Sequence, residues 1–406
     1  MTQFAHVDKI NVSIWGRRVG SLVAAPQRGV YAFRFERGFL SSGIEISPIM
    51  MPLRREPYVF PELPRSAYSG LPPVFADSLP DAFGRGLVDR WLVEHGIARS
   101  EITPLDELAY IGHRGMGALA YEPDRGPSGR PTAIDLRTLA ESARRAVNGE
   151  LDGMDEDEAL RTIIRLGSPA GGAQAKAVVG WNRKDGRFQI GDRDLPPGFE
   201  HWIVKFTPPE YPWRGEREFA HYEKALAAGI RMSESRLCEV DGVKHFMTRR
   251  FDREDGRRHH VLSLSAMVHL PAETPMEYRR YEQLFIAADS LHLPYEDREE
   301  LFRRMAFNVL VGEFDDHPKN FSFMLREGDV WRLAPAYDLT GADFPSEDPW
   351  HAHVGTHNMS VNGRFTGITE RDLLTVADRF GIGTAKGILA SDMWRGITYT
   401  GARNEG

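Results

Sequence analysis

The hydrophobic pattern of the chain changes at about residue 262, and this change limits the folds that the chain can adopt. Before it, alternating segments such as INVSIWG, KAVVGW and HWIVKF predict β-strands, which are separated by turns containing Gly and Pro. After it, MEYRRYEQLFIAADSL and DREELFRRMAFNVLVGEF carry apolar residues at helical spacing. The sequence therefore predicts an α+β protein with a mixed α/β N-terminal part and a mainly helical C-terminal part.

The length of 406 residues favours two or three domains, because a typical domain has about 150 residues. Residues 124–135 are rich in Pro, Gly and Ser and resemble a linker. We therefore expect three domains or subdomains, at residues 1–125, 126–265 and 266–406. The last long helix is expected to begin at Asp297, because Glu300 follows three residues later as in a capping box.

The composition excludes several classes of protein. A single cysteine, Cys238, rules out an internal disulfide and a cysteine-built zinc site, which fits a reducing cytoplasm. The sequence has no apolar run typical of a signal peptide, nor the roughly 18 apolar residues of a membrane span. A formal net charge of -7 argues against broad binding of nucleic acid by the chain itself. We expect a cytoplasmic protein with no membrane contact.

The stretch FDDHPKNF, residues 314–321, contains the pattern of a phosphoryl-transfer site. Protein kinases use D-x-x-x-x-N, in which the Asp is the catalytic base and the Asn binds a metal. Asp315 and Asn320 have that spacing, whereas Asp316 does not and is expected to hold the loop. Asp338 follows a short predicted strand, where a second magnesium-binding carboxylate is expected.

Two further features could contact phosphate groups. Lys205 lies in the otherwise apolar strand HWIVKF. A lysine there either blunts an edge strand or contacts phosphate, and the sequence alone leaves both explanations open. Upstream, Gly171 and Gly172 allow backbone amides to approach an anion, although the spacing is not that of a Walker A motif.

These segments, in this order, resemble the HipA family of bacterial toxin kinases. The matching stretches are FADSLPDAFGRGL, GHRGMGALAYEP, GSPAGGAQAK, HWIVKF, REFAHYEKALAAGI, RRFDR, FDDHPKNFSF and LAPAYDL. The resemblance implies a two-lobed, protein-kinase-like fold that uses ATP and Mg²⁺ to phosphorylate serine or threonine in proteins.

The resemblance also implies roles for single residues. Asp315 would be the base, Asn320 and Asp338 the magnesium ligands, and Lys205 the contact to the ATP phosphates. Ser168 would be a regulatory serine, whose autophosphorylation ejects the glycine-rich loop and inactivates the enzyme. The other nucleotide contacts would be Gly171, Gly172, Ala173 and Gln174 of that loop, Met247, Arg249 and Phe251 of a hinge beside adenine, and His317 and Lys319, with Asp338.

Members of this family act with partners. The resemblance implies a helix-turn-helix antitoxin of the HipB type, and contact with DNA only through that antitoxin. It also implies a protein substrate involved in translation, such as an aminoacyl-tRNA synthetase.

Other functions fit parts of the sequence. A small-molecule kinase on the same scaffold and a catalytically silent binding module both remain open. A metal-dependent hydrolase would use Asp315, Asp316, His317, His351, His353 and His357. Against the hydrolase, HAHVGTHNMSVNG has the alternation and Asn-Gly turn of a β-hairpin, so its histidines need not converge.

Overall fold

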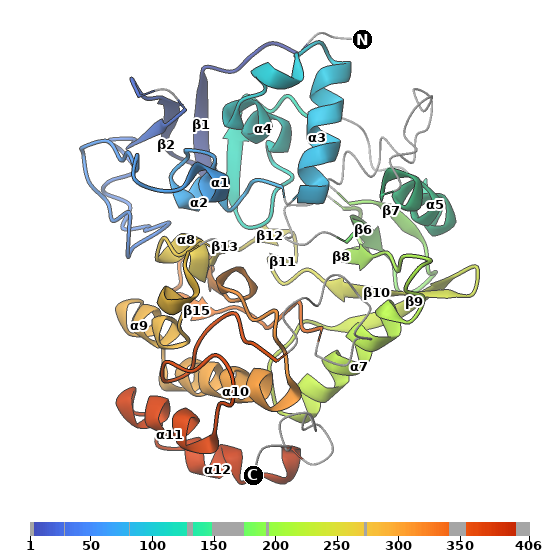
Figure 1. The fold of residues 1–406 in the computed structure, drawn as a ribbon. Helices are drawn as coiled ribbons and strands as arrows, with labels where there is room; N and C mark the ends of the chain where they lie inside the picture. Colours follow the sequence, from blue (N-terminus) through green and yellow to red (C-terminus); the bar gives the residue numbers. More distant parts are fainter. Residues whose placement is uncertain are drawn as a thin grey trace. The chain divides into compact units, whose positions relative to one another are not determined.

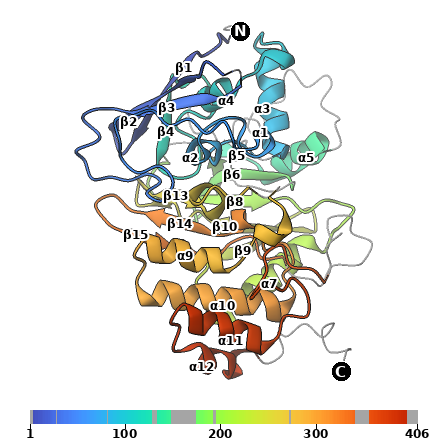
Figure 2. The ribbon, with the colours of Figure 1, turned by 60° about the vertical axis from the view of Figure 1, so that its left-hand side comes forward.

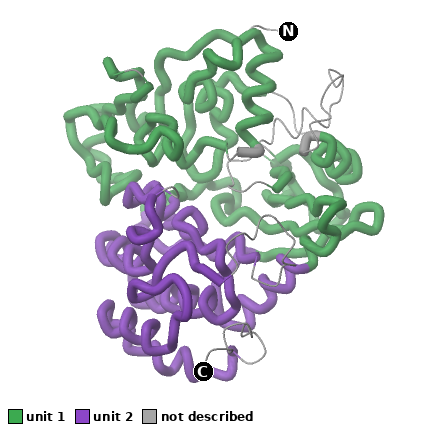
Figure 3. The backbone as a smooth tube through the Cα atoms, in the orientation of Figure 1, with its two compact units in different colours: residues 1–216, 234–262, 326–328 green, residues 217–233, 263–325, 329–406 purple. Residues whose placement is uncertain are grey.

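The computed structural model describes most of the chain as two compact units (Figure 3). Unit 1 comprises residues 1–216, 234–262 and 326–328, and unit 2 comprises residues 217–233, 263–325 and 329–406. The described residues are 4–27, 29–80, 82–127, 133–147, 174–191, 195–271, 274–340 and 355–394.

Unit 1 begins with a four-stranded antiparallel sheet in the order β3-β2-β1-β4 (Figure 1 and Figure 2). Its strands are β1 (Lys9–Ile14), β2 (Arg17–Ala24), β3 (Tyr31–Phe35) and β4 (Leu119–Glu122). The segments between β3 and β4 are α1 (Arg65–Tyr68), α2 (Pro73–Ala76), α3 (Ala82–Glu94), η1 (Arg99–Glu101) and α4 (Pro104–Ile111). The alternation in β1 buries Ile10, Val12 and Ile14, as expected for a strand with one face on a core.

Six antiparallel strands form the second sheet of unit 1, in the order β5-β7-β6-β8-β10-β9. They are β5 (Ala133–Ile134), β6 (Lys176–Trp181), β7 (Phe188–Ile190), β8 (Glu200–Lys205), β9 (Ser235–Val240) and β10 (Val243–Arg249), and α5 (Leu136–Val147) lies next to β9. Trp202, Ile203 and Val204 of β8 are all buried, so both faces of this strand are covered. Because β8 lies between β6 and β10, Lys205 does not serve to blunt a sheet edge.

A buried ion-pair cluster joins the first sheet of unit 1 to the segment after β10, which contains β11 (Arg253–Glu254), β12 (Arg257–Arg258) and β13 (His260–Ser263). The Asp252 carboxylate accepts hydrogen bonds from Arg250, from Arg253 and from the backbone N–H of Gly117. Burial raises the pKa of Asp252, but the charges of Arg250 and Arg253 outweigh it and hold the pKa below its usual range. The charged form of the Asp252 carboxylate is thus favoured inside the unit.

Unit 2 is mainly helical, as predicted. Its elements are α8 (Leu264–Met267), η2 (Met276–Tyr278), α9 (Glu282–Ser290), α10 (Tyr295–Val311), η3 (Pro318–Asn320), β14 (Ser322–Leu325), β15 (Trp331–Leu333), α11 (Glu370–Arg379), α12 (Ala385–Leu389) and η5 (Asp392–Trp394). Helix α7 (Arg214–Ala227) spans the boundary between the units. No described helix has the length and apolar character needed to cross a membrane.

The predicted capping box at Asp297 is wrong. Helix α10 begins at Tyr295 after an N-cap at Pro294, so Asp297 lies inside the first turn. Its carboxylate instead accepts hydrogen bonds from Arg231, from Arg332 and from the backbone N–H of Leu333. Partners distant in sequence therefore take the acceptor that a local cap would have used.

Candidate active site

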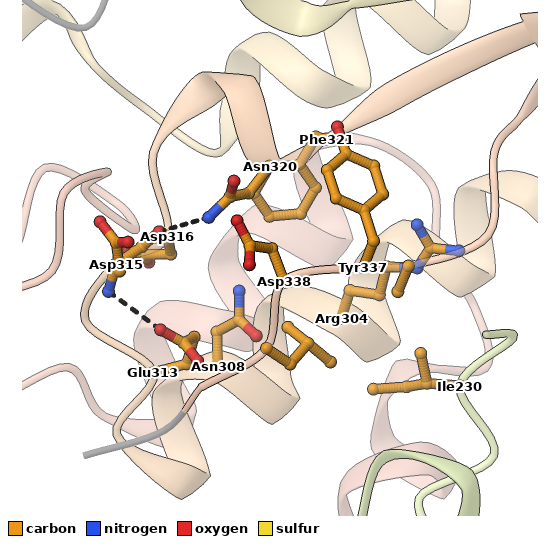
Figure 4. A pocket seen from close by; sticks show the side chains of 12 residues that line it. Ile230, Arg304, Asn308, Glu313, Asp315, Asp316, Asn320, Phe321, Tyr337 and Asp338 are labelled. Carbon is orange, nitrogen blue, oxygen red and sulfur yellow. Dashed lines mark hydrogen bonds between the residues drawn. The ribbon is translucent and has the colours of Figure 1, made fainter. Parts of the chain in front are cut away.

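A pocket in unit 2 brings together Asp315, Asp316 and Asn320 of the stretch FDDHPKNF (Figure 4). The end of α10, the loop 313–321 and the segment 336–339 form most of its wall. Its lining residues are Ile230, Arg304, Asn308, Glu313, Asp315, Asp316, Asn320, Phe321, Ala336, Tyr337, Asp338 and Leu339. Asp315 and Asn320, which the spacing selected, thus line one pocket with Asp338.

The loop begins where α10 is forced to end. Gly312 is the C-cap, with a φ of 69° in the left-handed region that favours glycine. The backbone N–H groups of Gly312 and Glu313 both donate to the carbonyl of Asn308, which satisfies a carbonyl that the helix leaves unpaired. The buried 17-residue helix thereby gives the loop a fixed starting point.

Asp315 and Asn320 are joined across the loop. The Asn320 Nδ2 atom donates to the Asp315 carbonyl at 2.8 Å, and the backbone N–H of His317 donates to the same oxygen at 2.9 Å. The Asp315 side chain is 56% exposed, and His317 Nε2 lies 3.8 Å from its Oδ1 atom. Figure 4 shows the side chain of Asn320 next to that of Asp338. The D-x-x-x-x-N spacing therefore closes a tight loop with an exposed carboxylate.

Asp316 has the opposite environment and is 1% exposed. Its carboxylate accepts hydrogen bonds from Tyr281 Oη at 2.6 Å, from His357 Nδ1 at 2.9 Å and from the backbone N–H of Asn358 at 2.7 Å. The Asn358 side chain in turn donates to the Phe314 carbonyl. Asp316 thus holds the loop to α9 and to residues 357–358.

Aromatic contacts fix both ends of the loop. The Phe314 ring lies 5.0 Å from the His357 ring, and the Phe321 ring lies 5.7 Å from the Tyr281 ring in an edge-to-face arrangement. These are the same two partners that donate to Asp316, so packing and hydrogen bonding act on the loop together.

Asp338 adopts a left-handed backbone conformation, with a φ of 57°. Such a conformation is uncommon for a residue with a side chain and persists where surrounding contacts hold it. Before Asp338, the Ala334 carbonyl accepts a hydrogen bond from Arg304 of α10, and the Ala336 N–H donates to the Arg231 carbonyl. The segment that carries Asp338 is therefore anchored to α10 and to residue 231.

In unit 1, the predicted phosphate contact Lys205 lies directly opposite Lys176 of β6. Directly paired residues of an antiparallel sheet share a face, so the two lysines concentrate positive charge at one place. Lys176 is 3% exposed, and the sequence argument missed it. Its position just after the glycine-rich stretch, at the start of a strand, was the available signal.

Other predicted nucleotide contacts in unit 1 are only partly described. Gln174 donates to the Phe206 carbonyl. Met247 is buried, and Arg249 at the end of β10 lies 3.7 Å from the Glu200 carboxylate. Ser168, Gly171, Gly172 and Ala173 lie outside the described residues, and Phe251 follows β10.

The histidines of the hydrolase alternative do not form a described metal site. His351 and His353 lie outside the described residues, and His357 is buried against Asp316. Within the residues that the structure describes, no group of three or more His, Cys, Asp or Glu side chains is placed to hold a metal ion. The turn predicted there is present, because Val361 and Arg364 pair around Asn362 and Gly363, which both have positive φ.

Comparison with known proteins identifies the family. The model of the HipA-like C-terminal domain matches residues 168–398, and that of the HipA N-terminal domain matches residues 10–122. The chain belongs to the HipA family. A HipA from Shewanella oneidensis, solved in a complex with HipB and operator DNA, has the same fold with a TM-score of 0.66 and 18% identity, covering 92% of this chain and 84% of that one.

Two curated proteins are similar in sequence to this HipA-family chain. "Putative kinase Y4dM" of Sinorhizobium fredii is 23% identical over 349 residues, which are 82% of this chain and 77% of that protein. A "Putative kinase" of Haemophilus influenzae is 27% identical over 154 residues, and the match spans 44% of its length. The predicted HipA-like fold and the family resemblance are both confirmed.

The oxygen atoms of the side chains that line the pocket would suit magnesium. Mg²⁺ favours oxygen donors and is commonly held by one or two carboxylates together with substrate phosphates and water. The carboxylates of Asp315 and Asp338 and the amide of Asn320 line the same pocket. Because the phosphates supply further ligands, such a site does not require a cluster of three acidic side chains.

The two adjacent aspartates are expected to differ in their effect on stability. Asp316→Asn removes an acceptor from a buried group with three donors, so it should lower the free energy of unfolding by about 1–3 kcal/mol. Asp315→Asn, at an exposed side chain, should change it by less than about 0.5 kcal/mol. Denaturant unfolding followed by circular dichroism measures both, and a larger loss for Asp315→Asn would contradict this assignment.

Proposed function

We propose that this HipA-family chain is an ATP- and Mg²⁺-dependent serine/threonine protein kinase. The observation that carries the proposal is the convergence of Asp315, Asn320 and Asp338 in one pocket, while the neighbouring Asp316 is buried in hydrogen bonds. The names of the two curated relatives support it. The chemistry needs a base, metal-binding oxygens and phosphate contacts, and the chain offers a residue for each role.

Asp315 is the proposed catalytic base. Its exposed carboxylate is available to a substrate hydroxyl, and the hydrogen bonds to its backbone keep it in place. Asn320 and Asp338 are the proposed magnesium ligands. The ion would neutralise charge that develops on the transferred phosphoryl group.

The remaining contacts would hold ATP. Lys205 would bind its phosphates, with Gly171, Gly172, Ala173 and Gln174 of the glycine-rich loop. Met247, Arg249 and Phe251 would lie beside the adenine, and His317 and Lys319 near the nucleotide. In this assignment residues 1–125 form an N-terminal subdomain and residues 126–265 form the ATP-binding core. Residues 266–406 form the helical lobe that carries the catalytic loop.

The proposed biological role is that of a toxin controlled by a small antitoxin. The similar HipA of Shewanella oneidensis was solved with HipB and operator DNA, which supports a helix-turn-helix partner of the HipB type. The net charge of -7 fits contact with DNA through that partner rather than directly. The proposed substrate is a translation protein such as an aminoacyl-tRNA synthetase, phosphorylated in the cytoplasm.

The purified chain should transfer phosphate from radiolabelled ATP to protein in the presence of Mg²⁺. Asp315→Ala should lower the rate by about 10²–10⁴-fold, because it removes general-base help. Asp338→Ala should lower it at least as much, and removal of Mg²⁺ with a chelator should abolish labelling.

Asp329→Ala is the matched control, since this exposed aspartate lies in the same unit before β15 and should label like the wild type. Labelling that survives Asp315→Ala unchanged would show that another group is the base. Transfer of phosphate to a small molecule with no labelled protein would instead favour the small-molecule kinase. Absence of any ATP turnover would favour the catalytically silent binding module.

Ser168 is proposed as the autophosphorylation site. A phosphate there would add about -1.5 to -2 charge beside a loop that binds ATP phosphates, so the phosphorylated chain should be inactive. Ser168→Ala should lose most of the self-labelling yet keep phosphorylating its substrate, as mass spectrometry and the labelling assay would measure. Ser290→Ala, at an exposed position of α9, is the control, and self-labelling retained by Ser168→Ala would reject the site.

The antitoxin proposal predicts that DNA binding requires two proteins. The chain alone should not shift a DNA fragment from upstream of its own gene in a gel. Addition of the product of an adjoining small reading frame should produce a shift that contains both proteins. A shift by the chain alone would contradict the indirect contact with DNA.

A further inference from the structure

Two side chains that the proposed chemistry does not use connect the catalytic loop to the segment carrying Asp338. They are Glu313, at the start of the loop, and Tyr337, immediately before Asp338. Both line the same pocket of unit 2, and Figure 4 shows them on different sides of Asp338.

Glu313 forms the first connection. It is 2% exposed, and its two carboxylate oxygens accept from two different segments. One oxygen accepts from the backbone N–H of Asp315 at 3.0 Å, and the other from the backbone N–H of Thr340 at 2.6 Å. Hydrogen bonds to a buried carboxylate are stronger than neutral ones, so this bridge firmly sets the spacing between residues 315 and 340.

Tyr337 forms the second connection, at the other end of the loop. The Tyr337 hydroxyl donates to the Lys319 carbonyl at 2.6 Å. The Ser322 hydroxyl lies 2.6 Å from the Tyr337 hydroxyl oxygen. Since the Tyr337 proton is directed at Lys319, Ser322 is the donor in the second bond. The hydroxyl of one residue thus holds the chain on both sides of Asn320.

The two connections flank the proposed base and the proposed metal ligands. Asp315 and Asn320 lie between the loop's two attachment points, and Asp338 lies between Tyr337 and Thr340. The left-handed backbone of Asp338, which needs support from its surroundings, is therefore held on both sides.

We propose that Glu313 and Tyr337 are positioning residues that fix Asp315 and Asn320 against Asp338, and so set the affinity of the pocket for a nucleotide-bound divalent cation. The inference rests on the proposed function, because the cation matters there as the partner of ATP. The advantage is that the ligand oxygens need little rearrangement when the ion binds.

The test measures metal binding separately from catalysis. Mn²⁺ serves as the probe, and its electron paramagnetic resonance signal reports binding to the full-length chain with a non-hydrolysable ATP analogue. Tyr337→Phe removes only a hydroxyl and should weaken Mn²⁺ binding about 3- to 10-fold. Glu313→Gln should weaken it about 10-fold or more, because the amide nitrogen cannot accept from a second N–H.

A kinetic measurement separates positioning from general damage. The half-saturating Mg²⁺ concentration for phosphoryl transfer should rise by the same factors, and high Mg²⁺ should restore most of the Tyr337→Phe rate. The melting temperature of Tyr337→Phe should stay near that of the wild type. Loss of rate that high Mg²⁺ does not restore would reject the proposal.

Two variants in unit 2 serve as matched controls. Asp372→Asn alters another buried acid that accepts a backbone N–H, that of Thr369, at a helix start that does not line the pocket. Tyr295→Phe removes a hydroxyl that bonds to Thr384. Both should leave Mn²⁺ affinity unchanged even where they lower stability.

The outcomes distinguish this inference from the proposed function. If Glu313→Gln and Tyr337→Phe bind Mn²⁺ and the analogue as the wild type does, the positioning role is wrong while kinase activity can still be present. If the variants bind more weakly but the wild type labels no protein, the positioning role stands and the protein-kinase function is wrong.

Discussion

The geometry of the loop 313–321 depends on the hydrogen bonds to the buried Asp316 carboxylate. Three donors, Tyr281, His357 and the Asn358 backbone, converge on it inside unit 2. Removing such an acceptor would leave buried donors without partners, which costs more than the bonds themselves contribute. These hydrogen bonds hold the loop in an arrangement in which the side chain of Asp315 is exposed. Asp316 thereby holds in place the neighbouring residue that we propose as the base.

Helix α10 supports the pocket from two ends. Near its start, Asp297 and Glu300 accept from Arg231, and Asp297 also accepts from Arg332 and from the Leu333 backbone. In its middle, Arg304 donates a hydrogen bond to the Ala334 carbonyl. At its end, the Gly312 C-cap terminates the helix before the loop 313–321. The segment with Asp338 and the loop with Asp315 are thus both attached to one helix. Their attachment lowers the conformational entropy that they would lose on binding a ligand.

Local patterns predicted much of this architecture, and contacts between distant residues account for the rest. Periodicity predicted β8, α10 and the helical C-terminal part, and the D-x-x-x-x-N spacing selected two residues that prove to line one pocket with Asp338. The capping box at Asp297 failed because its carboxylate has partners at residues 231, 332 and 333. Lys176, Glu313 and Tyr337 were missed for the same reason, since their significance arises only from strand pairing or from bridges between segments.

Four acidic side chains line the pocket, and two of them are buried acceptors of hydrogen bonds. Glu313 and Asp316 accept hydrogen bonds from backbone N–H, hydroxyl and imidazole groups, which stabilise their charge inside the protein. The Asp338 carboxylate and the Asn320 amide also line the pocket, where they are the proposed oxygen donors to a divalent cation. In the proposed positioning role, the hydrogen bonds of Glu313 and Tyr337 would keep the loop and the segment with Asp338 from moving apart, so that the proposed ligand oxygens would stay in place for the ion.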